Sequence, residues 1–259
     1  MKTIVQNYTL GFKKQQHRFG VWKPGAHIRL GDVGTFDGAE FFRKGNLSDK
    51  RFGITFRTIT GPRTAKEQFS SEGAARTEIN AGTTLPDAGK LKGKIKLSFA
   101  SSNAFHVETI GNVISAIDNI FAIETQIKNL QTKKRWENNL VIITEIETVE
   151  RAHLVIATTK ESEIEFEATG DVNVASVNLA EANTGLQITR NKNIQNIREF
   201  TEPIVLTFNA VKLKGLFRSS LQPMGILSYK SKNLDIGLKE KIEYSLAEIS
   251  PADLNLENF

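Results

Sequence analysis

Cysteine is absent from all 259 residues of this chain. Its absence excludes a disulfide framework, a thiolate metal site, a cysteine nucleophile and a cysteine-linked lipid anchor. Long apolar runs are missing too, since no stretch approaches the roughly 18 uninterrupted apolar residues of a transmembrane helix. Residues 1–16 contain neither an apolar core nor a small-residue cleavage site. We therefore expect no signal peptide and a cytoplasmic protein.

The motifs that would mark an enzyme are also missing. The four histidines are scattered and match no metal-ligand spacing. Residues 31–34 (GDVG) lack the third glycine of a dinucleotide fingerprint and the Gly-Lys-Ser/Thr of a phosphate loop. There is no Gly-x-Ser-x-Gly elbow and no helix-turn-helix, zinc-finger or aromatic RNA-binding motif. We expect no catalytic residue, no metal, no cofactor and no nucleic-acid partner.

The composition is that of a folded protein with an uneven charge distribution. Apolar residues make up 39% and charged residues 24% of the chain, which is typical of a globular protein. The net charge is +5, but residues 1–100 carry 18 Lys and Arg against 8 Asp and Glu, and the remainder is acidic. A basic front half favours an anionic partner: nucleic acid, a lipid surface or the acidic half of a second copy. The alternative is that the charge serves solubility alone.

The most regular part of the chain is residues 140–171, which read as two or three consecutive strands. Ile164, Phe166 and Ala168 alternate with three glutamates, which is the period of a half-buried strand. Leu140–Ile146 and Leu154–Ala157 are β-branched runs on either side of a polar break. A hairpin of this kind has one apolar and one acidic face. It can cover a core in water, or lie against lipid with its acidic face in water.

Other patterns complete the predicted fold. Apolar residues at three- and four-residue spacing predict one long helix over Thr109–Trp136, and a weaker pattern predicts a second over Leu234–Leu246. Residues 1–20 show no clean period, glycine-rich residues 20–61 predict short strands and turns, and residues 62–91 read as a long loop. Further strands are predicted at Phe52–Phe56, Lys92–Phe99, Val172–Leu179, Leu186–Arg190 and Pro203–Leu213. We expect an α+β fold: a twisted, mainly antiparallel sheet with long hairpins and one long amphipathic helix.

Two groups of cations are candidate lipid-binding residues. Lys13, Lys14 and Arg18 lie between two phenylalanines, a mixture that suits a membrane surface or a nucleic-acid strand, although a solvated loop is the simpler interpretation. In the strand at 92–99, three lysines share one face. This stripe could bind an anionic surface, or it could protect the edge of a sheet from pairing.

The order of elements from residue 92 to residue 213 resembles the second half of the gasdermin pore-forming domain. The resemblance depends on the order strand, helix, long hairpin, strand. It depends also on two apolar segments, NLVIITEIET at 139–148 and PIVLTFNAVKL at 203–213. The chain departs from the family in two respects. It lacks the N-terminal cysteine that is palmitoylated in bacterial members, and only about 45 residues follow Leu213, whereas animal members carry a large inhibitory domain.

The resemblance implies a latent pore-forming protein of cell death or defence. Residues 1–241 would form one pore-forming domain, and the acidic residues 242–259 a tail that could be inhibitory and be released by an activating protease or another partner. The domain would move from the cytoplasm to an acidic lipid membrane, form a homo-oligomer and insert β-hairpins to form a β-barrel. A charge on the lipid face costs about 2–4 kcal/mol near the midplane, so acidic alternates would face the lumen. The residues that would bind lipid are Lys13, Lys14, Arg18, Lys23, Lys92, Lys94 and Lys96. The apolar hairpin face would comprise Ile142, Ile146, Leu154, Ile156, Ile164, Phe166 and Ala168, and the lumen would be lined by Glu145, Glu147, Glu163, Glu165 and Glu167. The alternative function is a soluble β-rich binding or structural protein that does not touch membranes.

Overall fold

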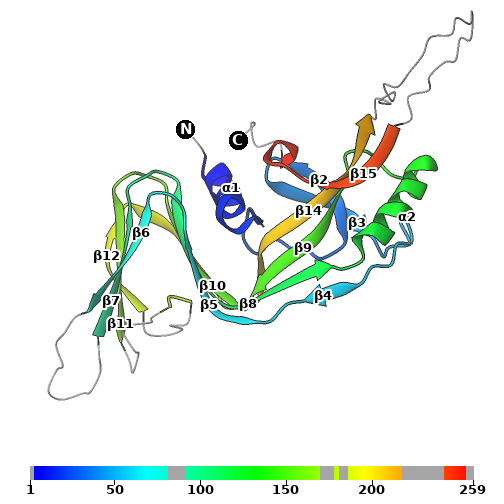
Figure 1. Ribbon diagram of the computed structural model, residues 1–259. Helices are drawn as coiled ribbons and strands as arrows, with labels where there is room; N and C mark the ends of the chain where they lie inside the picture. The colour runs from blue at the N-terminus through cyan, green and yellow to red at the C-terminus, as the bar shows by residue number, and fades with distance from the viewer. Residues whose placement is uncertain (1–2, 81–91, 170–177, 181–185, 218–241, 255–259) are drawn as a thin grey trace, which may run out of the picture.

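The computed structural model describes residues 3–80, 92–169, 178–180, 186–217 and 242–254 (Figure 1). This part of the chain contains many antiparallel strands and two α-helices, so the predicted α+β class is confirmed. The first elements are α1 (Ile4–Gln16), β1 (Phe19–Gly20), β2 (Asp32–Asp37), β3 (Glu40–Asn46), β4 (Thr58–Thr60), β5 (Thr64–Ser70), β6 (Ala74–Asn80), β7 (Lys92–Phe99) and β8 (Ala104–Ile117). They are followed by α2 (Ile120–Thr132), β9 (Val141–Val149), β10 (Arg151–Ala157), β11 (Ser162–Thr169), β12 (Leu186–Lys192), β13 (Ile194–Phe200), β14 (Ile204–Phe217), β15 (Ile242–Glu248) and the 3₁₀-helix η2 (Pro251–Leu254).

The predicted helix over Thr109–Trp136 is wrong in its first part. Residues as far as Ile117 belong to the long strand β8, and α2 begins only at Ile120. The apolar residues that suggested a helix there are mostly β-branched, and such residues lose side-chain freedom in a helix and favour a strand. Helical spacing and strand pairing compete in such a segment, and the sheet prevails because β8 pairs with four other strands.

The N-terminal segment forms a helix that its sequence pattern did not predict. Thr3 and Gln6 make a capping box at the start of α1, and His17 ends the helix in a left-handed conformation. Val5, Tyr8 and Phe12 are buried at helical spacing. Polar residues interrupt that stripe, which hides the period, so α1 depends on tertiary packing for its stability.

Three further predictions need correction. The predicted loop 62–91 contains β5 and β6, and only residues 81–91 lie outside the described part. Phe52–Phe56 is not a strand; Phe52 and Ile54 are buried from a connecting segment in one core cluster with Trp136. The predicted helix at 234–246 is contradicted over 242–246, which belongs to β15. Its earlier part is outside the described residues, as is 172–177 of a predicted strand.

The predicted strands at 140–168 exist, but they do not pair with one another. The strands β9 and β10 follow each other along one direction, and both pair with the single long strand β8. The next strand, β11, pairs with β7 and β12 instead. The segment therefore contributes to two different sheets. An 11-stranded sheet, called here the large sheet, contains β8, β9 and β10, and a four-stranded sheet, the hairpin sheet, contains β11.

The hairpin sheet has the order β12-β11-β7-β6, and one end of the large sheet has the order β13-β10-β8-β5. Figure 1 shows these two sets of strands as the two legs of an arch. Between the legs lies an apolar core of Ile95, Leu97, Phe99, Ile164 and Phe166 from the hairpin sheet with Val155 and Ala157 from the large sheet. The opposite face of the large-sheet leg packs on α1 through residues such as Phe12, Phe105 and Leu154. The hairpin sheet is thus a layer that folds back onto the large sheet, to whose strands its own strands are connected.

Candidate membrane-insertion and lipid-binding sites

The hairpin sheet consists of two hairpins, β6–β7 and β11–β12. Each of its strands continues directly into the strand of the large sheet that occupies the same place in the order: β6 into β5, β7 into β8, β11 into β10 and β12 into β13. The connections are the short turns 71–73, 100–103 and 158–161 and the single residue Asn193. Both sheets therefore have the same strand neighbours, and only these four turns separate them.

All four turns contain a residue in the left-handed region. These residues are Gly73 (φ 84°), Asn103 (φ 59°), Glu161 (φ 55°) and Asn193 (φ 64°). Glycine and asparagine adopt this conformation readily, whereas Glu161 does so at some cost. Each turn thus reverses the chain by a local backbone conformation, which an extended strand would not contain.

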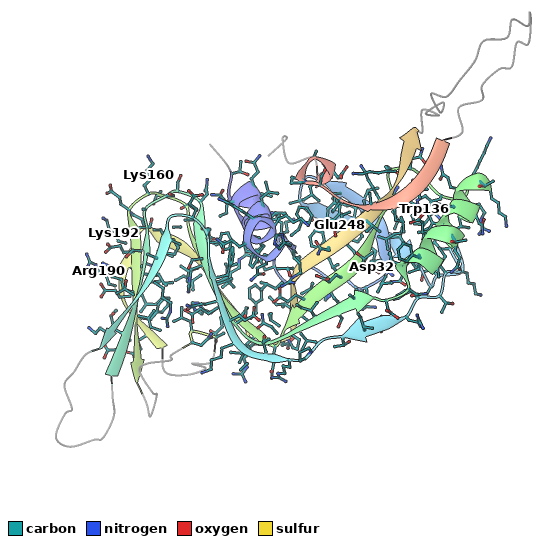
Figure 2. All side chains as sticks on the ribbon, viewed as in Figure 1. Asp32, Trp136, Lys160, Arg190, Lys192 and Glu248 are labelled. Atoms are coloured by element: carbon teal, nitrogen blue, oxygen red, sulfur yellow. The ribbon has the colours of Figure 1, made fainter. Side chains whose placement is uncertain are left out.

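The hairpin sheet has one charged and one apolar face. Glu163 faces Lys96 (3.1 Å) and Arg190 (3.8 Å), Glu165 faces Arg190 (3.5 Å), and Glu167 faces Lys94 (3.9 Å). The hydrogen bond from Lys96, together with the positive charges around Glu163, lowers the pKa of this carboxylate. Ile164 and Phe166, on the other face, are buried in the arch. Of the predicted lumen-facing residues, these three glutamates do share one face of a hairpin, and Figure 2 labels Arg190, the partner of two of them, on the hairpin sheet.

The other predicted hairpin residues are spread over the large sheet. Ile142 packs in the core beneath α2, Leu154 and Ile156 face α1, and Ile146 lies beside a third apolar cluster. Ala168 is in β11, but its side chain is outside the described part. Among the described side chains of that predicted face, only Ile164 and Phe166 therefore lie on the apolar face of the hairpin sheet.

Glu147 lies in a buried polar network. Its carboxylate accepts hydrogen bonds from Asn112 (2.8 Å) and Thr207 (2.6 Å), and Arg18 lies 3.6 Å away. The Arg18 guanidinium also reaches Glu145, at 3.8 Å. Arg18, predicted to bind lipid, and the two glutamates, predicted to face a lumen, are therefore partners of one another in this conformation.

Five of the other predicted lipid-binding cations are also paired within the described part of the chain. Lys13 reaches Glu248 (3.7 Å), Lys14 reaches Glu72 (3.8 Å) and Lys23 reaches Glu40 (3.1 Å). Lys94 and Lys96 contact the glutamates of β11, and the side chain of Lys92 is outside the described part. Exposed ion pairs contribute only about 0–1 kcal/mol, so an anionic surface can compete for such lysines. None of these five described lysines, however, is a ready-made free cation.

A second group of cations, which the predicted set did not include, lies where α2 ends. Lys50, Arg51, Lys133, Lys134 and Arg135 are exposed there, and we call them the basic corner. The two segments meet because Phe52 packs on Trp136 with ring centroids 5.4 Å apart and Arg135 donates to the carbonyl of Arg51 (2.9 Å). Figure 2 labels Trp136 beside α2.

Few carboxylates balance the basic corner. Glu137 binds Lys44 (3.0 Å) and Arg51 (3.1 Å), and these two cations, Lys44 first, lower its pKa. The Asp49 carboxylate accepts the backbone N–H of Asn46. Within the described residues, no ion pair joins Lys50, Lys133 or Lys134 to a carboxylate. These three are therefore available to an anionic ligand.

A polar cluster lies between the two legs of the arch. Arg76 of β6 donates to Glu108 of β8 (Nε to Oε1, 2.8 Å), and this ion pair joins the two sheets. The second oxygen of Glu108 accepts the backbone N–H of Leu179 (2.7 Å), and His106 lies 2.9 Å from the first. The other ring nitrogen of His106 lies 2.7 Å from the hydroxyl of Ser70. We call these four side chains and the Leu179 amide the polar clasp.

The polar clasp is closed to solvent. Glu108 and His106 are each 1% exposed. Burial raises the pKa of Glu108, but the hydrogen bonds from His106 and Leu179 and the nearby Arg76 charge outweigh it, so the pKa is below its usual range. A buried charged pair is expensive to break because the charge left behind has lost its water. The polar clasp therefore favours the folded-back position of the hairpin sheet.

The C-terminal residues are integrated into the fold. The strand β15 pairs with β14, and Ile249 and Leu254 are buried beside Val5 and Phe19. Asp253 contacts both Lys212 and Lys214. Burial raises the Asp253 pKa, but hydrogen bonds from Lys212 and Ser250 outweigh this and lower it to about 2. The acidic C-terminal segment therefore packs on basic residues. One of them is Lys13 of α1, which pairs with Glu248, labelled in Figure 2.

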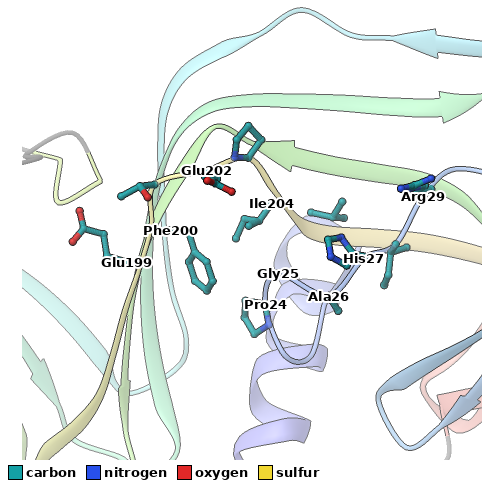
Figure 3. A pocket seen from close by; sticks show the side chains of 13 residues that line it. Pro24, Gly25, Ala26, His27, Arg29, Glu199, Phe200, Glu202 and Ile204 are labelled. Carbon is teal, nitrogen blue, oxygen red and sulfur yellow. The ribbon is translucent and has the colours of Figure 1, made fainter.

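A separate pocket of about 540 Å³ lies between residues 24–29 and 199–205, at the bend from β13 to β14 (Figure 3). Pro24, Phe200 and Ile204 form part of its wall. Its charged residues, among them His27, Arg29 and Glu199, are exposed. The lining offers no buried polar side chain that would fix a ligand, so we assign the pocket no function.

Two searches of the described residues bear on other functions. No group of three or more His, Asp or Glu in that part of the chain could hold a metal ion. Neither of the two described α-helices has the length and apolarity needed to cross a membrane.

Comparisons with known proteins give one match to report. No protein-family model matches the chain, and a search of curated proteins finds no match. Among solved structures, the chain is similar to the cryo-EM structure of the gasdermin A3 membrane pore, with 11% identity over 83% of this chain and 91% of that chain. The TM-score is 0.27, which is too low to carry an argument about fold or function.

Proposed function

We propose that this chain is a latent pore-forming protein. In the proposed cycle it binds a membrane rich in acidic lipid, assembles with further copies, and converts its two hairpins into membrane-spanning strands. We infer no enzymatic step. The proposal includes a cytoplasmic resting form that moves to the membrane when it is activated.

The observation that carries the proposal is the matched strand order of the two sheets. Because β6, β7, β11 and β12 continue into β5, β8, β10 and β13, the hairpin sheet can swing out and extend the large sheet while all of its own strand pairs stay intact. The change needs new backbone conformations only at the four turns. Unpaired backbone groups are too costly in lipid, so a sheet can insert into a membrane only if it keeps its hydrogen bonds between strands.

The dimensions and faces of the hairpin sheet suit this role. Its strands are seven or eight residues long, and the turns would add to them on straightening. A membrane-spanning strand needs about 9–11 residues. On opening, the apolar face with Ile95, Leu97 and Phe166 would meet lipid and the face with Glu163 and Glu165 would meet water, as a spanning strand requires.

Assembly would use the outer strands of both sheets. Among the described strands, β5 and β6 each pair on one side only, and so do β12 and β13. Once the sheets are aligned, the edge β5–β6 of one copy could pair with the edge β12–β13 of the next. Exposed strand edges are templates for such pairing, and closure into a barrel would remove them.

We place the first contact with acidic lipid at the basic corner. Each well-placed Lys or Arg near an anionic surface contributes about 1 kcal/mol. Lys50, Lys133 and Lys134 have no carboxylate partner among the described residues. At the other end of α2, Phe121 is 83% exposed. The lysines of the hairpin sheet already face glutamates, which favours the basic corner over them.

The C-terminal segment could restrain the resting form. It covers Lys13, Lys212 and Lys214 with Glu248 and Asp253. A protease or another partner that detached it would free these cations. The basic residues at which we propose a cut (Lys230, Lys232 and Lys239–Lys241) lie outside the described part.

Dye release from liposomes tests the function. Liposomes with and without acidic lipid are mixed with the full chain and with a Lys50→Gln/Lys133→Gln/Lys134→Gln variant. Loss of three contacts of about 1 kcal/mol each predicts binding roughly 100-fold weaker. The matched control, Lys94→Gln/Lys96→Gln, removes cations that are paired and should bind normally.

Binding and leakage distinguish the outcomes. Leakage from acidic liposomes that the triple variant loses supports the proposal. Binding without leakage from any liposome, even after removal of the C-terminal segment, contradicts pore formation. The absence of both binding and leakage would favour a soluble β-rich binding protein. The internal pairing of Lys94 and Lys96 agrees with that alternative, although β7 pairs with a strand on each side and is not the sheet edge that its lysines were predicted to protect.

A further inference from the structure

A second buried histidine lies in the arch beside the polar clasp. His153 of β10 is 6% exposed and stands opposite Glu108 in the strand ladder. Its ring and the ring of Phe166 on the facing hairpin sheet meet in a T-shaped arrangement, with centroids 5.4 Å apart. Its Nδ1 has no hydrogen-bond partner among the described residues. The surroundings of His153 are therefore apolar on the side of Phe166, and Phe166 belongs to the hairpin sheet, which is proposed to move.

We propose that His153 is an acid-sensitive trigger that releases the hairpin sheet when it becomes protonated. The inference rests on the proposed function, since it concerns the same detachment of the hairpin sheet. An imidazolium in this place would have its charge beside the aromatic ring of Phe166, without water, and would find no acceptor at Nδ1 within the described structure. Detachment of the hairpin sheet gives the charged ring access to water.

The charges around His153 determine the sign of the effect. Glu108 and His106 lie on the neighbouring strand β8, and Arg76 approaches from β6 on the facing sheet. On the other side β13 places Glu199 opposite His153, and Glu199 is exposed; β11 contributes Phe166. Glu108 favours a charged ring, whereas His106 and burial oppose it, and burial is the largest effect. It lowers the His153 pKa from 6.5 to about 4.

The linkage between protonation and opening follows from that difference. In the closed arch His153 is neutral down to about pH 4, while in the opened form it takes up a proton near pH 6.5. Closure is therefore fully favoured above about pH 6.5 and is lost progressively between that value and 4. The opening constant should rise about 30-fold by pH 5 and more than 100-fold by pH 4. Glu108 acts in the same direction at still lower pH, because its pKa is lowered in the closed form.

Hydrogen exchange of the intact chain in the absence of lipid tests this inference apart from the pore. Protection factors of β7 and β11 amides are measured from pH 7.5 to pH 4, with β9 and β14 of the large sheet as the internal reference. The expected result is a loss of protection of about 30-fold at pH 5 in the hairpin sheet alone. Equal protection at pH 7.5 and pH 4, or an equal loss in both sheets, overturns the trigger.

Two variants assign the effect to the residue. His153→Phe keeps a ring against Phe166 and cannot titrate, so its loss of protection at pH 5 should fall below about threefold; His17→Asn, at an exposed histidine, should behave as the parent chain. A His153→Phe chain that keeps the 30-fold loss overturns the assignment. Should His153→Phe not fold, His153→Gln supplies the same comparison. Acid-dependent exchange without leakage from acidic liposomes supports the trigger and contradicts the pore. Leakage together with exchange that does not depend on pH supports the pore and contradicts the trigger.

Discussion

Replacing Arg76 with methionine tests whether the polar clasp holds the arch closed. The substitution keeps an unbranched side chain of similar reach but removes the cation that faces Glu108. Glu108 is 1% exposed and keeps its contacts to Leu179 and His106, yet its charge loses the partner on the other sheet. Breaking a buried charged pair in this way costs about 3–5 kcal/mol.

That cost should fall on one part of the molecule. Arg76 belongs to the hairpin sheet, so the variant should lose protection against hydrogen exchange in β6, β7, β11 and β12. Urea unfolding followed by circular dichroism gives the total change in stability, and exchange shows where it lies. Loss of the Arg76 charge removes an influence that lowers the Glu108 pKa, so the defect should shrink as the pH falls and Glu108 becomes neutral.

A double-mutant cycle provides the control. Glu108→Gln alone and Arg76→Met/Glu108→Gln complete the cycle, and the double variant should be more stable than the sum of the single effects by about 1–3 kcal/mol. Additivity to within about 0.5 kcal/mol would show that the two side chains do not stabilise each other and would refute the clasp.

Three further predictions concern other parts of the fold. Asp253→Asn should weaken docking of the C-terminal segment by about 2 kcal/mol at pH 7, because the Asp253 pKa is lowered to about 2. In the parent chain the same stability should be lost as the pH falls from about 4 towards 2. Unfolding curves of both chains across this range measure the two effects. Gly111→Ala should destabilise β8, because Gly111 has φ 68° and an added Cβ would lie 2.7 Å from the Glu150 carboxylate and 2.9 Å from Arg63. Ala116→Gly in the same strand is a comparison without that clash. Thermal unfolding measures the stability of both variants. Leu254→Ala should cost about 2–5 kcal/mol through the cavity that it leaves beside α1, and an unchanged urea midpoint would show that η2 is not part of the core.

The strands with strict alternation could be predicted from the sequence. Ile164 and Phe166 against Glu163 and Glu165 gave β11 correctly, and the same period gave β7 and β14. The α+β class followed from these. Local patterns failed where packing overrides them, as in β8, whose β-branched residues fit both periods, and in α1, whose buried stripe is interrupted by polar residues.

Strand partners could not be predicted, because pairing depends on register between distant segments. The lysines of β7 and the glutamates of β11 were both visible as stripes, but nothing in the sequence set Lys96 opposite Glu165 in the ladder. The basic corner shows the same limit. Lys133 and Lys134 fall in the last turn of the helix predicted over Thr109–Trp136, but their approach to Lys50 depends on the packing of Phe52 on Trp136.

The polar clasp left one signal that sequence reasoning missed. His106 and Glu108 alternate with the apolar residues Phe105 and Val107 in β8, which indicates a polar contact on one face of the strand. Their partners Ser70 and Arg76 lie in the segment predicted to be a loop. Without β5 and β6 there was no sheet to face them, so the contact could not be inferred.

The most direct test of the proposed function is the surroundings of β11 after the chain has bound a membrane. Because the chain has no cysteine, single cysteines at residues 163–167 can each carry an environment-sensitive fluorophore. With acidic liposomes, labels in place of Ile164 and Phe166 should be quenched by lipid-bound quenchers. Labels in place of Glu163, Glu165 and Glu167 should be quenched only by a quencher in water. Labels at Ile164 and Phe166 that remain shielded from both quenchers, with the chain bound to the liposomes, would show that the arch stays closed and would contradict the proposed pore.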